Sequence, residues 1–434
     1  MSKSYTKSFY LLTALFFTFG LITVLVDSLI PRLKDIFELS YFQAGLVQFA
    51  FFIAYGVTSI PSGNLLHKIG YKKGVILGLA IMGIGCLFFL PAAAFRTFWI
   101  FMLGYFVLAS GMTVLQVAIN PYVTVLGDER TASSRLTLSQ AFNSLGTTIA
   151  PALGAIFILS DSIKSSEEIK ALDAATKDSY LSNEASAVQM PFLLLAISLL
   201  ILAFIVFKAK LPQLLSAAVG SNYMQALKHK QLSLGVVGIF FYVGAEVAIG
   251  SFLVNYFYDS GLAPIVAENG TMMNIANSIA STFNKTFSGS DPKSLLGIFV
   301  IFYWGGAMIG RFVGAYLTKI MSPGKVLSMF AALAISMILI SINTTGLISM
   351  WSILAVGLFN SIMFPTIFTL SLEGLGDLKA QASGLLCMAI VGGAVIPFFF
   401  GSLIDGFGFK TAFILTILCY GYILYYGRSK GKKA

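Results

Sequence analysis

Charged residues are scarce in this sequence. Only 11% of its 434 residues are Asp, Glu, Lys or Arg, and 57% are hydrophobic, whereas a soluble globular domain has about 25% charged residues. This composition excludes a large water-soluble enzyme. A helix that crosses the roughly 30 Å hydrocarbon core of a bilayer needs about 20 apolar residues, and the chain contains many runs of that length. We therefore expect a polytopic membrane protein embedded in a lipid bilayer.

Histidine and cysteine are also rare. The two histidines fall in expected loops, and all three cysteines lie within apolar runs, where a thiol behaves as a small hydrophobe. Neither a disulfide framework nor a zinc site is indicated. The sequence has no HExxH, GxSxG or Walker A motif, which removes the usual signs of a hydrolase or an ATP-driven pump. We expect no enzyme activity and no cofactor beyond a coupling ion.

Twelve apolar stretches of spanning length follow one another along the chain. They lie near residues 9–31, 41–66, 74–94, 97–126, 136–160, 189–208, 233–258, 295–318, 325–343, 346–371, 380–403 and 410–427. The sequence therefore predicts an all-α membrane protein with 12 transmembrane helices.

Lys and Arg are divided unevenly between alternate connections. With the N-terminus inside, 18 of them fall on the cytoplasmic side and 9 on the other. Positively charged loops stay in the cytoplasm, so both termini are expected there. The net charge of +10 is spread singly or in short clusters between apolar runs, so it predicts topology and no nucleic-acid partner.

A basic connection lies at the middle of the chain. Residues 208–232 are predicted to be a cytoplasmic linker between two six-helix halves, 1–207 and 233–434. Two long polar connections, 161–188 and 259–294, are predicted to be external, and a short surface helix is compatible with the second. Their roles are not indicated by the sequence.

An internal repeat supports this division. The Gly, Leu, Lys and Ile of residues 63–69 recur in the same places at 314–320, and Pro121 and Pro151 are echoed by Pro365 and Pro397. Six-helix halves related by an axis along the membrane normal are a transporter architecture, with the substrate site at mid-membrane between them.

Several motifs resemble those of known transporters. Residues 63–73 resemble the loop between helices 2 and 3 of the major facilitator superfamily, although His67 stands where that family usually has Asp. Six further segments are similar to the fucose, galactose and glucose permease family: 27–31, 42–48, 120–127, 140–146, 241–246 and 364–368. Residues 305–311, 359–366 and 389–394 resemble its bacterial glucose/galactose transporter branch. The resemblance implies the major facilitator fold with two pseudo-symmetric halves, in a bacterial inner membrane, and we expect a monomer.

Two carboxylates lie inside predicted spans, where an ionisable group costs roughly 3 kcal/mol or more and usually marks a pathway. Asp27 is in the first helix and Glu246 in the seventh. In the fucose branch the proton-linked carboxylates are an Asp in helix 1, matched by Asp27, and a Glu in helix 4, where this sequence has Gln116. That departure favours Na⁺ over H⁺, with Asp27 and Glu246 as possible Na⁺ ligands, although the sequence leaves both ions open.

Amide side chains suit a sugar, because each amide both donates and accepts hydrogen bonds. Helix–helix hydrogen bonding is the alternative role for each of them. Gln116, Gln140 and Asn143 are the favoured sugar contacts, and the further candidates are Gln48, Asn120, Asn360 and the aromatic Tyr242. Three basic residues, Lys68, Lys72 and Arg311, are expected at the cytoplasmic gate, with Arg311 near the cytoplasmic end of its helix.

These features predict a cation-coupled symporter that takes up glucose or galactose by alternating access. Uptake of N-acetylglucosamine, or of L-fucose with H⁺, is the alternative within transport. A transport-inactive sugar sensor with the same fold is a lesser alternative.

Overall fold

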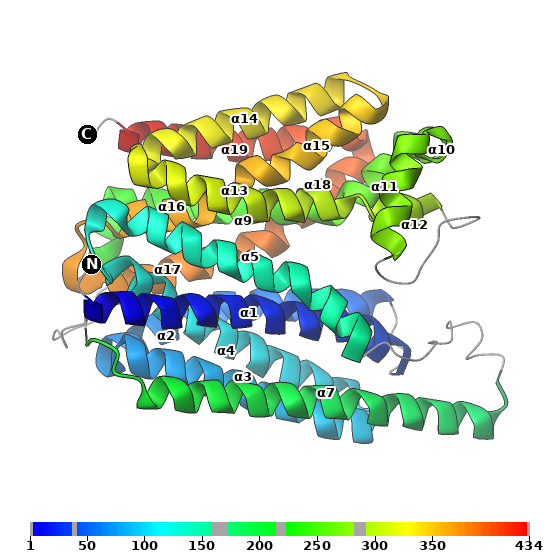
Figure 1. The fold of residues 1–434 in the computed structure, drawn as a ribbon, viewed down its shortest axis with the longest axis horizontal. Coiled ribbons are helices and arrows are strands. Elements are labelled where there is room, and N and C mark those ends of the chain that lie inside the picture. The colour runs from blue at the N-terminus through cyan, green and yellow to red at the C-terminus, as the bar shows by residue number, and fades with distance from the viewer. Residues whose placement is uncertain (1–2, 37–40, 158–171, 214–222, 282–291, 432–434) are drawn as a thin grey trace. The chain divides into compact units, whose positions relative to one another are not determined.

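The structure, a computed structural model, describes residues 3–36, 41–157, 172–213, 223–281 and 292–431. Within these ranges every regular element is a helix (Figure 1). Side chains are not described for 26–48, for 151–157 and for most of 174–188. The fold class expected from the apolar runs is confirmed over the described part of the chain.

Eleven helices of the described residues are long and apolar enough to cross a membrane. The remaining expected span corresponds to α5 (Ala132–Phe157). Its C-terminal end adjoins residues 158–171, which the structure does not describe. The protein is therefore a multi-pass membrane protein.

The helices form two compact units, each described here by itself. Unit 1 contains Met1–Gly127, Leu145–Ala226 and Gly374–Met388, and unit 2 contains Asp128–Ser144, Leu227–Glu373 and Ala389–Ala434. The units differ from the predicted halves in two segments. The beginning of α5 packs in unit 2, and α17 (Lys379–Met388) packs in unit 1.

Long helices lie side by side in unit 1 (Figure 1). They are α1 (Lys3–Ile36), α2 (Tyr41–Ile69), α3 (Tyr71–Ala94), α4 (Phe98–Val125) and α7 (Ala174–Lys208). Glycines let α3 and α4 approach closely: a methyl group added at Gly85 would lie 2.5 Å from the amide nitrogen of Leu108. Small residues at helix interfaces are typical of membrane proteins, where tight packing replaces the hydrophobic effect.

Unit 2 is built in the same way. Its long helices are α9 (Lys230–Asp259), α13 (Val300–Ile320), α14 (Pro323–Asn343), α15 (Gly346–Asn360), α16 (Met363–Leu372), α18 (Gly392–Phe407) and α19 (Phe409–Gly431). Between α9 and α13, three short helices gather at one end of the unit (Figure 1): α10 (Leu262–Glu268), α11 (Gly270–Ser281) and α12 (Pro292–Gly297). The sequence anticipated at most one short helix there.

The other long polar connection also contains more helix than expected. Helix α7 begins at Ala174, whereas the apolar run predicted a helix only from residue 189. The apolar part alone is a candidate span, from Gln189 to Lys208. Several alanines, Lys177 and Glu184 before residue 189 favour a helix without making the segment strongly hydrophobic, so hydropathy found the span but not the beginning of the helix.

The linker contributes a short helix, α8 (Tyr223–Lys228). Its first residue packs against α2, where the Tyr223 hydroxyl donates a 2.5 Å hydrogen bond to the carbonyl of Ile60. Burial raises the pKa of Tyr223 to about 12, so the phenol stays protonated and keeps donating. The end of the linker region is thereby fixed to the cytoplasmic end expected for α2.

Candidate functional site

Helix α9 places two predicted site residues on one face. Tyr242 and Glu246 are separated by four residues, hence one turn apart. The Tyr242 side chain is 1% exposed, and its phenol lies close enough to the Glu246 carboxylate to interact electrostatically with it. Among the described residues, neither the Tyr242 hydroxyl nor Glu246 Oε1 has a hydrogen-bond partner at standard distance and angle. The pair therefore presents two unsatisfied polar atoms in the interior of unit 2.

A break between α15 and α16 brings a positive charge toward this pair. The apolar run at 346–371 predicted one helix, but α15 ends at Asn360 and α16 begins at Met363. Pro365 has no N–H group, so it leaves the carbonyl of Ser361, four residues earlier, without its helical donor. Arg311 Nε donates to that carbonyl at 3.2 Å. The proline thus creates the acceptor that holds the guanidinium.

Arg311 lies in the interior of α13, deeper than the helix-end position expected from the sequence. Its Nη1 also donates to the hydroxyl of Ser144 on α5, and its charge interacts with Glu246. No ion pair with a carboxylate is formed by Arg311 within the described residues. Arg311 therefore lies within electrostatic reach of Glu246 without an ion pair to it, and its expected role in the gate stays a prediction.

Asn360 and Tyr303 complete the cluster. Asn360 Nδ2 donates to the Tyr303 hydroxyl at 2.8 Å, and that hydroxyl donates to the backbone carbonyl of Glu246 at 3.2 Å. Both side chains are 0% exposed. Helices α9, α13 and α15 are thus joined by a chain of hydrogen bonds that fixes the backbone from which Glu246 projects.

Four buried polar atoms of the cluster have no hydrogen-bond partner within the part of the chain that the structure describes. They are Tyr242 Oη, Glu246 Oε1, Asn360 Oδ1 and Tyr420 Oη, the last on α19. An unsatisfied buried donor or acceptor costs about 1–3 kcal/mol, so such a concentration indicates a place that water, an ion or a polar substrate fills. We call Tyr242, Glu246, Tyr303, Arg311, Asn360 and Tyr420 the polar cluster of unit 2.

Unit 1 holds a second group of expected site residues, on α4. Gln116 Nε2 donates to the hydroxyl of Tyr55 on α2 at 2.9 Å, so at least one of its hydrogen bonds joins helices. Asn120 is 0% exposed and lies beside the Cys387 thiol of α17. Pro121 frees the carbonyl of Val117 as Pro365 frees that of Ser361, and Ser383 of α17 donates to it at 2.8 Å. The repeated prolines therefore have the same structural use in both units.

The predicted residues on α5 belong to unit 2. Gln140 and Asn143 are half-buried and precede Ser144, the residue that contacts Arg311. Since Gln140 and Ser144 are four residues apart, they share a face of α5. Gln140 thus lies on the face of α5 that the Arg311 side chain reaches.

Some expected site residues are not tested by the structure. The side chains of Asp27 and Gln48 lie outside the described residues. Lys68 is exposed near the end of α2. Lys72 donates 2.8 Å hydrogen bonds to the carbonyls of Phe207 and Ala209, at the end of α7. Within the described residues, no three His, Cys, Asp or Glu side chains come together as a metal site, and Na⁺ ligation by Asp27 stays a prediction.

Sequence reasoning missed Tyr420, Ser144 and Ser361. Tyr420 is one of 18 tyrosines, so its residue type carried no signal. The role of Ser361 depends on its backbone carbonyl, and the proline four residues later was the available signal.

Comparisons with known proteins show the family of the chain. The family model of the Major Facilitator Superfamily matches residues 11–396. The chain is 46% identical to a "Glucose/galactose transporter" of Brucella abortus biovar 1 (strain 9-941), over 98% of this chain and 94% of the relative. It is 32% identical to the "L-fucose-proton symporter" of Escherichia coli (strain K12), over 100% of this chain and 95% of that one.

A solved structure of similar fold is the transporter FucP "in the outward conformation". It is 30% identical in sequence, with a TM-score of 0.86 and 99% of both chains covered. The chain therefore belongs to the major facilitator superfamily and, within it, to the fucose/galactose/glucose permease family.

Proposed function

We propose that this protein is a cation-coupled symporter that takes up glucose or galactose by alternating access. The observation that carries the proposal is Glu246, an acidic group inside an apolar helix, amid buried polar atoms without partners. Relatives that are 46% identical over nearly the whole chain and named for glucose and galactose transport support the substrate class.

The proton is the proposed coupling ion. The sodium preference expected from Gln116 finds no support in the comparisons, whereas two relatives are named L-fucose-proton symporters. A bound Na⁺ needs several oxygen ligands around it, whereas a single carboxylate is enough to take up and release a proton. Together with Asp27, Glu246 of unit 2 can therefore carry the proton, the role that the helix 4 carboxylate has in the fucose branch.

Charge compensation is the proposed basis of coupling. A bare carboxylate inside a membrane costs roughly 3 kcal/mol or more, so a protonated Glu246 favours closure around bound sugar. After the proton leaves, Arg311 offers the compensating charge, which allows the empty carrier to return. Gln116, Gln140, Asn143 and Asn360 remain the proposed sugar contacts.

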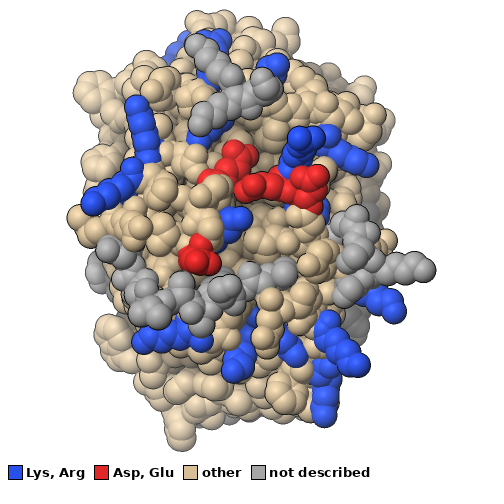
Figure 2. Space-filling view, turned by 90° about the vertical axis from the view of Figure 1, so that its left-hand side faces the viewer, with Lys and Arg blue, Asp and Glu red and all other residues tan. Residues whose placement is uncertain are grey.

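The orientation is proposed from charge. Basic residues occupy the last turns of α2, α13 and α19, and Lys and Arg side chains are prominent on the face shown in Figure 2. Positively charged loops stay in the cytoplasm. We assign these helix ends to the cytoplasmic side of a bacterial inner membrane, with both termini inside.

Uptake of labelled glucose by proteoliposomes, in the presence of unlabelled competitors, tests the substrate class. We expect excess glucose and galactose to inhibit uptake strongly, and L-fucose and N-acetylglucosamine to inhibit it weakly. Protein-free liposomes provide the control for leakage. Specific binding of glucose without any uptake would favour the sensor, and stronger inhibition by N-acetylglucosamine than by galactose would reassign the substrate.

A further inference from the structure

Gln116 is the one residue of α4 between Gly111 and Asn120 that is not buried. Its Nε2 donates to the hydroxyl of Tyr55 on α2 at 2.9 Å, while its Oε1 accepts no hydrogen bond from the described residues. That oxygen does not belong to the buried polar atoms without a partner, so it lies at an accessible surface. One end of the amide is therefore held by Tyr55, and the other end is open to a ligand.

The Tyr55 ring is itself fixed by its surroundings. The side chain is 1% exposed, and its ring centre lies 5.2 Å from that of Phe51. The buried Cys387 thiol of α17 lies close enough to interact electrostatically with the phenol. Tyrosine has only two side-chain torsions, whereas glutamine has three. A rigid partner thus holds a flexible side chain in place.

This hydrogen bond matters for a ligand of Gln116 in two ways. A glutamine that is free to rotate loses that freedom when a ligand fixes it, and the loss weakens binding. The bond to Tyr55 restricts the side chain before the ligand arrives. In addition, the bond occupies the N–H end of the amide, so the accessible end is an acceptor, to which a sugar hydroxyl can donate.

We propose that Tyr55 is a positioning residue of the sugar site, because its hydroxyl orients Gln116 so that Oε1 accepts a hydrogen bond from one hydroxyl of the sugar. The role of Tyr55 rests on the proposed function, in which Gln116 contacts glucose or galactose. Tyr55 acts through Gln116 and does not touch the sugar. The site therefore selects for a donor at one position of the sugar ring.

Tyr55→Phe tests this role, because it removes the hydroxyl and keeps the ring with its contact to Phe51. Counterflow of labelled glucose in proteoliposomes gives KM and Vmax without any ion gradient. We expect KM to rise roughly fivefold to tenfold, as the loss of one hydrogen bond implies, with little change in Vmax. A bond that only joins α2 to α4 would instead lower the midpoint of thermal unfolding and leave KM unchanged.

Competition by the monodeoxy derivatives of glucose gives a second measurement on the same proteins. The derivative that lacks the hydroxyl bound by Gln116 should compete more weakly than glucose with the wild type. In Tyr55→Phe the difference between that derivative and glucose should shrink, since glucose has lost the same hydrogen bond. Identical differences for every derivative in both proteins would contradict the role of Tyr55.

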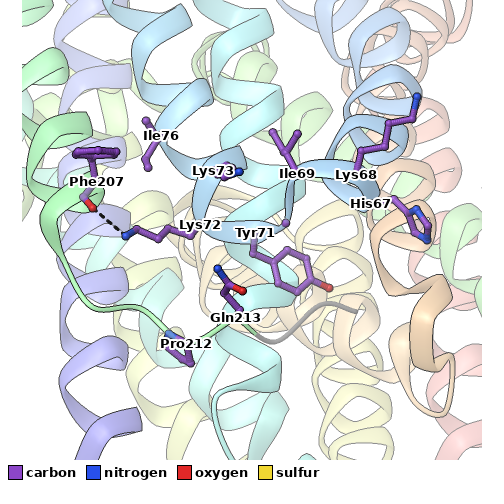
Figure 3. Close-up of a pocket in the computed structure, with 11 residues that line it drawn as sticks. His67, Lys68, Ile69, Tyr71, Lys72, Lys73, Ile76, Phe207, Pro212 and Gln213 are labelled. Atoms are coloured by element: carbon purple, nitrogen blue, oxygen red, sulfur yellow. Dashed lines mark hydrogen bonds between the residues drawn. The ribbon is translucent and has the colours of Figure 1, made fainter. Parts of the chain in front are cut away.

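Two further variants provide the controls. Gln116→Met keeps the length of the side chain without its amide, so adding Tyr55→Phe to it should raise KM no further. Tyr122→Phe also removes one buried hydroxyl of unit 1. That hydroxyl donates at 2.7 Å to the carbonyl of Pro212, in the segment that follows α7 (Figure 3). Its loss should leave KM unchanged.

The outcomes separate the role of Tyr55 from the proposed function. Normal glucose transport by the wild type, with an unchanged KM in Tyr55→Phe, would overturn the role of Tyr55 alone. Equal increases of KM in Tyr55→Phe and Tyr122→Phe, or a further increase in the double variant, would also overturn it. No glucose transport by the wild type would overturn the proposed function, and the role of Tyr55 with it.

Discussion

Glu246→Gln is expected to abolish uphill accumulation of sugar while sugar exchange across the membrane continues. Gln has nearly the shape of Glu, so the polar cluster and its neighbours keep their packing. It cannot take up and release a proton, so movement of sugar is no longer linked to the gradient. A gradient of one pH unit is worth about 1.4 kcal/mol, or about tenfold in concentration ratio for one proton per sugar. The variant should only equilibrate labelled glucose, whereas the wild type should reach that ratio.

Glu268→Gln is the matched control, because Glu268 is an exposed acidic residue of α10. It should accumulate sugar as the wild type does. Counterflow of labelled glucose in the Glu246→Gln protein verifies that the variant is folded and still binds sugar. Undiminished accumulation by Glu246→Gln would remove Glu246 from the coupling mechanism.

Gly357→Ala is expected to destabilise unit 2 and to disturb the polar cluster. A methyl group at Gly357 would overlap the carbonyl oxygen of Tyr303 and lie 2.7 Å from its carbonyl carbon. Helix α15 would have to move away from α13, and Asn360, one turn later, would lose its 2.8 Å bond to Tyr303. Overpacking of this kind costs about 1–3 kcal/mol. We expect a lower midpoint of thermal unfolding in detergent and a marked loss of transport.

Gly305→Ala gives the comparison within α13, because a methyl group there would meet no atom within 4 Å. Its thermal midpoint should stay near that of the wild type. Equal midpoints for Gly357→Ala and Gly305→Ala would show that α13 and α15 do not approach each other as the structure describes.

The apolar runs predicted the transmembrane helices well because the bilayer demands about 20 apolar residues for each crossing. They could not predict where helices break inside the membrane. The run 346–371 is apolar throughout, yet the helix is interrupted after Asn360, because Pro365 cannot donate to Ser361. The run at 380–403 is interrupted at residues 389–391 by a 3₁₀ turn, just before the paired glycines at the start of α18. Hydropathy does not detect such an interruption, because the residues on both sides of it are apolar.

The site was predictable only in part. Glu246 and Asn360 could be selected because polar groups are expensive inside a membrane span and therefore stand out. The place of Arg311 could not, because it depends on the depth of Arg311 within α13 and on a hydrogen bond to a carbonyl of another helix. Which helices pack together was also beyond the sequence, as the placing of α17 in unit 1 shows.

Proton movement driven by sugar tests the central claim most directly. Glucose is added to weakly buffered proteoliposomes that carry no ion gradient, and the external pH is recorded. We expect the external medium to become alkaline as sugar and protons enter together, and Glu246→Gln to abolish this change. Glucose entry without any pH change, or an entry that requires external Na⁺, would contradict proton coupling.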